Sequence, residues 1–147
     1  MITSTSSSQV KHVVNLQKKA KLRKEEKQFV VEGVKMVSEA PADRLVKVYV
    51  SETFKADNEE FLERMNYDSI GKDVLEIVTD NVFMRMADTQ TPQGIMAVVR
   101  MSDTDLEGIL SDKRNPLLLI IENLQDPGNL GTIVRMAEGA GVTGIIM

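Results

Sequence analysis

A short stretch near the C-terminus combines an amide and a guanidinium side chain with glycines, at a spacing that suits ligand binding. Pro127-Gly128 fits the two central positions of a type II turn, because proline fixes φ and glycine accepts a positive φ. A helix is expected from about Gly131 to Gly139, with Asn129 just before it. Arg135 follows Gly131 by four residues, so it lies on the same helix face one turn along. The pattern predicts an amide and a cation near a helix N-terminus.

The element before this stretch would place it where ligands bind. Leu117–Ile121 is an unbroken apolar run, typical of a strand that is buried on both faces in a parallel sheet. Open α/β sheets bind ligands outside the carboxyl ends of their strands, and helix N-termini favour anions. The turn residues alone would also fit a plain strand, turn and helix with a surface arginine.

The spacing of the whole stretch is more specific than its turn residues alone. It closely resembles the first motif of the SpoU/TrmH family of RNA ribose 2′-O-methyltransferases, N-x-x-D-P-x-N-x-G-x-x-x-R-x-A, within residues 117–147. The front of the chain resembles the same family's substrate-binding domain, but Ser7-Ser8 replaces an Asn-Pro that members often carry. This second resemblance rests on Ile2-Thr3-Ser4, Val10-Lys11, Lys21-Leu22-Arg23, Phe29-Val30-Val31-Glu32-Gly33, Glu39-Ala40 and Thr91-Pro92-Gln93-Gly94.

The resemblance implies methyl transfer from S-adenosylmethionine to a ribose 2′-hydroxyl of rRNA or tRNA. By position in the motif, Arg135 would orient the ribose-phosphate and help to activate the hydroxyl, and Asn129 would hold Arg135 or the substrate. Arginine is a poor free base because its pKa exceeds about 12. Activation assisted by the substrate's phosphate is therefore expected rather than simple deprotonation.

The resemblance also implies an architecture. We expect an α/β chain with a ribosomal-protein-like α/β/α sandwich over residues 1–105 that binds RNA, and a linker over 106–116. Residues 117–147 would be the truncated first βαβ unit of a SPOUT (trefoil-knot) methyltransferase domain. The family builds its cofactor pocket from later segments, so residues 1–147 alone are expected neither to bind S-adenosylmethionine well nor to methylate RNA. The full-length protein would form a homodimer.

The residue patterns support an alternation of strands and helices before the linker, which favours one sheet with helices on both faces. The expected strands are 29–31, 45–50, 74–78 and 94–100, and the expected helices are 8–19, 34–40, 57–65, 81–87 and 104–110. Residues 117–121 and 145–147 lack obvious neighbours. They are expected to pair with each other in parallel, to associate with a second copy, or to be disordered.

The charge distribution is uneven along the chain. The net charge is −4, but residues 1–28 hold seven basic residues against Glu25 and Glu26. This split fits either a contact with a polyanion or a solvated helix face. Taken alone, the charge distribution favours the solvated helix face. With the family resemblance, the candidate RNA contacts are Lys11, Lys21, Arg23, Lys24, Thr91 and Gln93.

The composition excludes several function classes. The absence of Cys and the presence of one His exclude disulfides, thiolate metal sites and multi-His metal sites. No apolar run reaches the roughly 20 residues of a membrane span and no signal-peptide core is present, so a cytoplasmic protein is expected. Gly139–Gly144 matches G-x-G-x-x-G, but it follows a helix and precedes a strand, so we expect a helix C-cap instead of a dinucleotide site. A stand-alone ribosomal-protein-like RNA-binding module is the alternative function.

Overall fold

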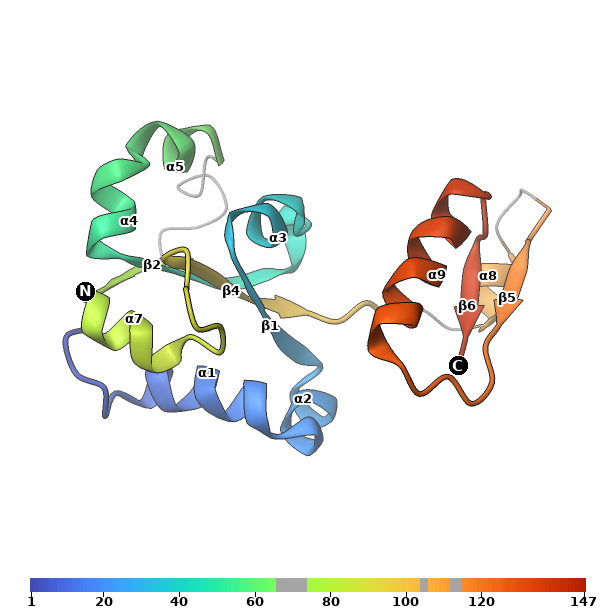
Figure 1. Ribbon diagram of the computed structural model, residues 1–147, viewed down its shortest axis with the longest axis horizontal. Helices are drawn as coiled ribbons and strands as arrows, with labels where there is room; N and C mark the ends of the chain where they lie inside the picture. Colours follow the sequence, from blue (N-terminus) through green and yellow to red (C-terminus); the bar gives the residue numbers. More distant parts are fainter. Residues whose placement is uncertain (66–73, 104–105, 112–114) are drawn as a thin grey trace. The chain divides into compact units, whose positions relative to one another are not determined.

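The computed structural model describes residues 1–65, 74–103, 106–111 and 115–147, and it divides the chain into two compact units, Met1–Met101 and Ser102–Met147 (Figure 1). The expected boundary lay at residue 105. The helix α8 (Leu106–Leu110) falls within the expected linker but belongs to the second unit. α8 belongs to the second unit because its Ile109 side chain packs against Gly144 of that unit.

The first unit is built on a four-stranded mixed sheet with the order β1-β4-β2-β3. Its strands are β1 (Gln28–Glu32), β2 (Leu45–Ser51), β3 (Leu75–Val78) and β4 (Ile95–Arg100). β4 is antiparallel to both β1 and β2, whereas β2 and β3 are parallel. The apolar run of β4 is buried from Ile95 to Val99, which explains its central place.

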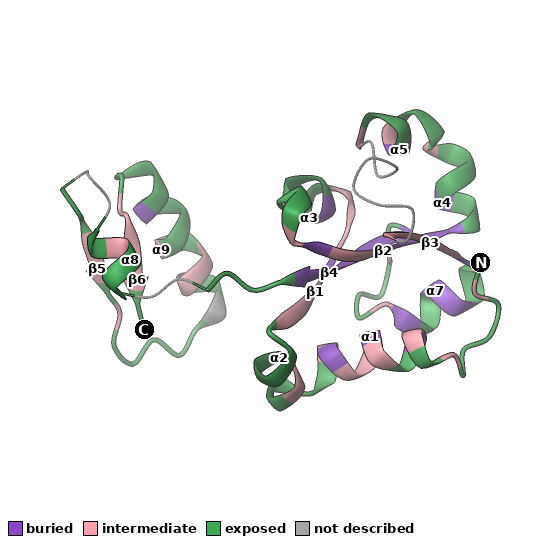
Figure 2. Cartoon of the chain, turned by 180° about the vertical axis from the view of Figure 1, so that it is seen from behind, coloured by how far each residue is buried: buried purple, intermediate pink, exposed green. Residues whose placement is uncertain are grey.

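Helices cover both faces of this sheet, as the alternation predicted (Figures 1 and 2). Side chains alternate along β4. Met96 and Val98 face α1 and α7, and Ile95, Ala97 and Val99 face the other helices. One face carries α1 (Ser8–Lys18) and α7 (Asp80–Met86), and the other carries α3 (Val34–Glu39), α4 (Glu52–Asp57) and α5 (Glu59–Met65).

Two helical segments differ from the expected ones. The helix expected over 57–65 is preceded by α4, because the Ser51 hydroxyl accepts a hydrogen bond from the Phe54 N–H at 3.1 Å and caps an earlier start. The basic segment after α1 forms a further helix, α2 (Ala20–Glu26), which the sequence patterns did not indicate. Lys27 ends it with a left-handed φ of 51°. A short 3₁₀ helix, η1 (Ala42–Arg44), precedes β2.

The second unit is a strand–helix–strand arrangement of β5 (Leu118–Ile120), α9 (Pro127–Gly139) and β6 (Gly144–Ile146), together with α8. β5 and β6 pair in parallel, which is one of the three arrangements expected for these segments. Gly141 has a φ of 76°, and the Val142 N–H binds the Ala137 carbonyl at 2.9 Å. These are marks of a glycine-based helix C-cap, so the expected role of Gly139–Gly144 is confirmed.

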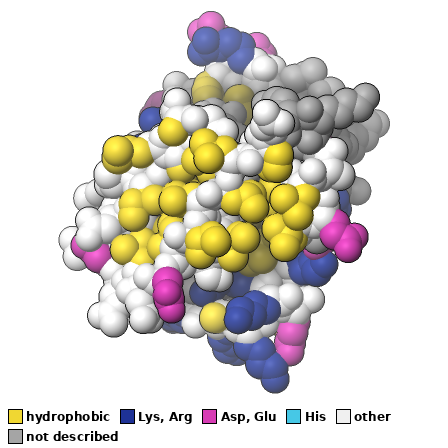
Figure 3. All heavy atoms as spheres, turned by 90° about the vertical axis from the view of Figure 1, so that its right-hand side faces the viewer, with side chains coloured by type: hydrophobic (Ala, Val, Ile, Leu, Met, Phe, Trp, Pro, Cys, Tyr) yellow, Lys and Arg dark blue, Asp and Glu magenta, His cyan; other side chains and the backbone are white. Residues whose placement is uncertain are grey.

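The second unit buries little apolar surface. Ala137 is its one buried hydrophobic residue in the described ranges, and Ile120 is 72% exposed. The expectation that the β5 segment is buried on both faces is therefore wrong for this chain. Figure 3 shows hydrophobic side chains gathered over one face of the molecule. The exposed large hydrophobic residues of this unit include Leu106, Leu110, Leu117, Ile120, Leu124, Val134, Met136, Ile146 and Met147.

Candidate functional site

The start of α9 differs from the expected turn. Pro127 is the first helical residue, and the Asp126 carboxylate accepts a hydrogen bond from the Gly128 N–H at 2.8 Å. Gly128 does not have the positive φ that a type II turn requires, so the predicted turn is wrong. Aspartate is a favoured N-cap and proline is favoured at the first helical position, so the helix begins four residues before Gly131.

Asn129 and Arg135 both lie on α9 with exposed side chains. Arg135 extends back over Gly131, where an added Cβ would lie 3.7 Å from its Nη1. Its Nη2 donates to the Thr132 hydroxyl at 3.4 Å, which is long for a hydrogen bond. Asn129 is in the first turn of the helix rather than before it, and its amide makes no hydrogen bond within the described residues. Both groups are therefore accessible to a substrate, although no contact joins them in the described part of the chain.

The basic N-terminal candidates have different surroundings. Lys11 and Lys24 are exposed, and Lys21 forms an ion pair with Glu25 at 3.7 Å. Arg23 is partly buried and its Nη1 donates to the carbonyl oxygens of Leu16 and Gln17, both at 2.7 Å. These carbonyls belong to the last turn of α1, where helix carbonyls lack intrahelical partners. Arg23 thus fixes α2 against the end of α1, a role that its place in a basic run did not indicate.

The loop before β4 is tied to the start of α3. The Gln93 side-chain oxygen accepts a hydrogen bond from the Val34 N–H at 2.8 Å, so it satisfies a helix N-terminal donor. Thr91 is exposed in the same loop. The Glu32 carboxylate accepts hydrogen bonds from the Asp88 N–H, at 3.1 Å, and from the Thr89 hydroxyl. The loop is therefore held in place, and Gln93 retains only its amide nitrogen for an RNA contact.

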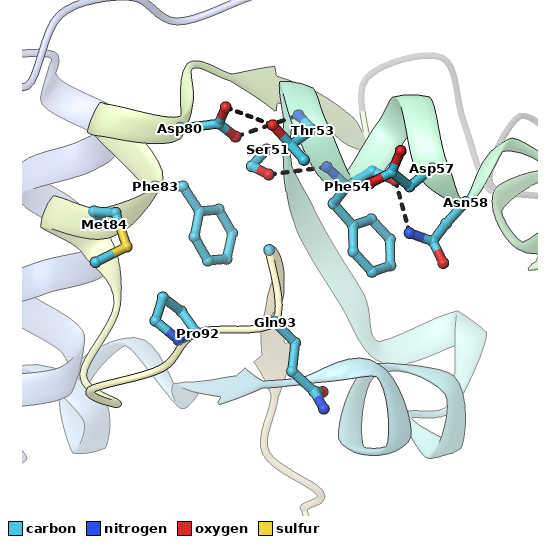
Figure 4. Close-up of a pocket in the computed structure, with 11 residues that line it drawn as sticks. Ser51, Thr53, Phe54, Asp57, Asn58, Asp80, Phe83, Met84, Pro92 and Gln93 are labelled. Atoms are coloured by element: carbon cyan, nitrogen blue, oxygen red, sulfur yellow. Dashed lines mark hydrogen bonds between the residues drawn. The ribbon is translucent and has the colours of Figure 1, made fainter.

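A pocket of about 330 Å³ lies where the parallel strands β2 and β3 end (Figure 4). Asp80 accepts hydrogen bonds from the Thr53 hydroxyl at 2.7 Å and the Thr53 N–H at 3.2 Å. The charged residues among its described lining are both acidic, so the pocket does not suit a phosphate. Its lining is Ser51, Thr53, Phe54, Asp57, Asn58, Asp80, Phe83, Met84, Pro92, Gln93 and Gly94.

A Thr53→Ala variant is expected to raise the pKa of Asp80 toward its ordinary value. Hydrogen bonds from the Thr53 hydroxyl, then from Ser51 and the Thr53 N–H, lower that pKa in the native protein. A lowered folded-state pKa stabilises the protein at pH values above the unfolded-state pKa of about 3.9. This stabilisation is lost as the pH falls through the folded-state pKa. The stability gap between wild type and variant should therefore narrow below about pH 4.

Carboxyl-carbon NMR titration from neutral to acidic pH measures this shift, with the Asp57 carboxyl of the same pocket as an internal control. Identical Asp80 midpoints in the two proteins would contradict the assigned cause.

In the described ranges, no three His, Asp or Glu side chains are grouped so that they could hold a metal ion. Among the helices described, none combines the length and apolar character needed to cross a membrane.

Comparison with known proteins places these features in context. Residues 7–97 match the family of MRM3-like substrate-binding domains. The chain is 31% identical over 144 residues to human mitochondrial rRNA methyltransferase 3, covering 92% of this chain and 32% of that protein. It is 30% identical over 125 residues to the 23S rRNA (guanosine-2′-O-)-methyltransferase RlmB of Haemophilus influenzae, covering 81% of this chain and 49% of that protein. The chain therefore spans a third to a half of the length of these relatives.

Solved structures share the fold. An rRNA methyltransferase from Sinorhizobium meliloti superposes with a TM-score of 0.75 at 24% identity, covering 98% of this chain and 52% of that one. A TrmH-family protein from Porphyromonas gingivalis gives a TM-score of 0.62 at 28% identity, covering 97% and 50% of the two chains. The mixed α/β fold of this chain thus matches that of SPOUT methyltransferases.

Proposed function

The chain belongs to the family of MRM3-like substrate-binding domains, whose matched relatives are SpoU/TrmH rRNA methyltransferases, and on that premise we propose that it serves 2′-O-methylation of an RNA ribose. The methyl donor would be S-adenosylmethionine. The observation that carries the proposal is the position of Arg135. An exposed guanidinium lies on the helix that follows β5, in the motif spacing of the family, and it comes later in the sequence than residues 7–97, which match the MRM3-like substrate-binding domain.

The finer architecture is part of the same proposal. The first unit would be the ribosomal-protein-like sandwich that binds RNA, and residues 117–147 would be the first βαβ unit of a trefoil-knot domain. The parallel pairing of β5 with β6 around α9 supports this, because a βαβ unit has that arrangement. The exposed apolar residues of the second unit would then be covered by further segments of a longer protein. That protein would act in the cytoplasm as a homodimer.

The cofactor does not fit the second unit as it stands. A pocket of about 200 Å³ lies beside β5 and β6, lined by Ile121, Asn123, Leu124, Leu130 and Met147. Small-molecule pockets usually begin near 300 Å³, and this lining offers one polar side chain for a ligand with an amine and a carboxylate. We therefore propose that residues outside this chain complete the cofactor site, and that the 147-residue chain alone does not methylate RNA.

The role of Arg135 follows from its charge state. A ribose hydroxyl is a poor nucleophile, so it must be positioned and its proton accepted. A guanidinium stays protonated in proteins, so Arg135 cannot accept that proton. A planar guanidinium instead binds phosphate through two N–H groups, and a phosphate oxygen beside the target ribose would take the proton. Asn129 would hold the substrate or Arg135 in this arrangement.

Disrupting the gene that encodes the chain tests the proposal without assumptions about the protein's length. The expected result is the loss of a 2′-O-methyl group at one site, mapped by alkaline-hydrolysis protection across rRNA and tRNA, and its return when the gene is restored. An unchanged methylation map in the disrupted strain would refute the methyltransferase role.

A stand-alone RNA-binding module is the second candidate. Among the described residues, the first unit has a buried core on both sides of its sheet, whereas the second unit buries one hydrophobic residue, so the first unit is the part of this chain best able to fold and act alone. An unchanged methylation map together with retained RNA binding by the purified chain would favour this candidate.

A further inference from the structure

We propose that a groove between α1 and α7 binds the sugar-phosphate backbone of the RNA, an inference that rests on the proposed RNA-binding function. The two helices lie side by side on one face of the sheet (Figure 1). The groove has a volume of about 210 Å³. Its lining consists of Thr5, Val10, Lys11, Val14, Asn15 and Arg85.

Local helix geometry places the α1 residues of the groove. Lys11, Val14 and Asn15 follow the spacing of one helix face, because residues three and four apart are neighbours on a helix surface. Val10 is buried beneath them and anchors α1 to the sheet. Arg85 is added from α7, which is separated from α1 by most of the first unit's sequence. The fold therefore brings two cations from different helices to one groove.

The charges around the groove favour an anion. Lys11 and Arg85 are exposed, and neither forms an ion pair with another residue in the part of the chain that is described. α1 contains no acidic residue. Asp80 is the one acidic residue of α7, and its carboxylate is bound to Thr53 of α4 in the acidic pocket described above. The one acidic residue of α7 thus already has a partner elsewhere.

The polar groups and the size of the groove indicate which kind of ligand it can hold. The Asn15 amide and the Thr5 hydroxyl provide a neutral donor and acceptor beside the two cations, which suits the hydroxyl of a ribose next to its phosphate. The volume is below the roughly 300 Å³ at which small-molecule pockets usually begin. A groove of this kind fits a phosphate and part of its sugar in a bound strand better than a free nucleotide.

The test compares two double variants of the 147-residue chain that remove the same amount of charge. Lys11→Gln with Arg85→Gln changes the groove, and Lys35→Gln with Lys55→Gln changes exposed lysines on α3 and α4 across the sheet. Binding to purified large-subunit rRNA is measured by filter binding between 50 and 200 mM KCl. Circular dichroism melting confirms that each variant is folded.

The groove variant should bind about tenfold or more weakly, because each cation would lose a charge-assisted contact. Its plot of log affinity against log salt should be shallower by about 0.7, the value for one phosphate contact on single-stranded RNA. The control variant should bind nearly as wild type does. An Asn15→Ala variant, which keeps the charge, should weaken binding and leave the salt slope unchanged.

The possible failures are distinguishable. Equal losses in the two double variants, or wild-type affinity and slope in the groove variant, would overturn the groove while leaving RNA binding intact. Failure of the wild-type chain to bind the RNA at any of these salt concentrations would overturn both the groove and the proposed RNA-binding role.

Discussion

An Arg135→Ala substitution introduced into the gene is expected to slow the formation of the 2′-O-methyl group that the intact gene restores by about 100-fold or more. Removing one group that stabilises charge in a transition state typically costs a factor of about 10² to 10³. The substitution should not unfold the protein, because the Arg135 side chain is exposed and its described hydrogen bond, to Thr132, is 3.4 Å long. The measurement is the rate at which new rRNA or tRNA acquires the modification.

Two further variants distinguish the role of the Arg135 guanidinium from the roles of its charge and of its hydrogen-bond partner. Thr132→Ala removes the weak hydrogen bond to Arg135 but keeps the cation, so methylation should continue. Arg135→Lys keeps a positive charge but loses the planar donor pair, so it should retain only part of the activity. Normal methylation by the Arg135→Ala protein, at wild-type protein level, would show that this residue does not serve the reaction.

Several elements of the fold were predictable because short-range signals agree. Thr79 accepts a hydrogen bond from the Val82 N–H, as a threonine before a helix should, and the helix predicted over 81–87 is α7. Asp126-Pro127-Gly128 carries two signals that compete. Proline and glycine fit a type II turn, but aspartate and proline also fit an N-cap and first helical position, and the helical alternative is the one observed.

The roles of the basic residues were less predictable because they depend on contacts between elements. Arg23 reads as one cation of a basic run, yet its partners are carbonyls at the end of α1. Charge reversal at Arg23 would therefore disturb the α1–α2 junction as well as any RNA contact, which makes it a poor test of RNA binding. The sequence does not place Arg85 beside Lys11, because α1 and α7 meet only by packing on the same face of the sheet. In the sequence, Arg85 is the one cation in the otherwise apolar last turn of α7.

A Gly94→Ala substitution is expected to lower the free energy of unfolding of the first unit by about 2–6 kcal/mol, from backbone strain of about 1–3 and overpacking of about 1–3 kcal/mol. Gly94 has a φ of 85°, and an added Cβ would lie 2.8 Å from the Phe54 Cβ and 3.0 Å from the Ser51 Oγ. Neither neighbour can move freely, since Phe54 is buried and Ser51 caps α4. Urea unfolding followed by tyrosine fluorescence gives the stability, because both tyrosines, Tyr49 and Tyr67, lie within the first unit's sequence.

Gly33→Ala is the matched control for this clash. Gly33 also has a positive φ, of 97°, but the atom nearest to its added Cβ is the Gln93 Oε1, at the end of a flexible side chain. It should therefore lose the strain term of about 1–3 kcal/mol, together with about 0.5–1.5 kcal/mol for the hydrogen bond from the Val34 N–H that a displaced Gln93 Oε1 would no longer accept. A Gly94→Ala protein as stable as wild type would mean that the loop before β4 does not hold Gly94 against α4. The placement of Thr91 and Gln93 as candidate RNA contacts would then fail with it, because the same loop positions all three residues.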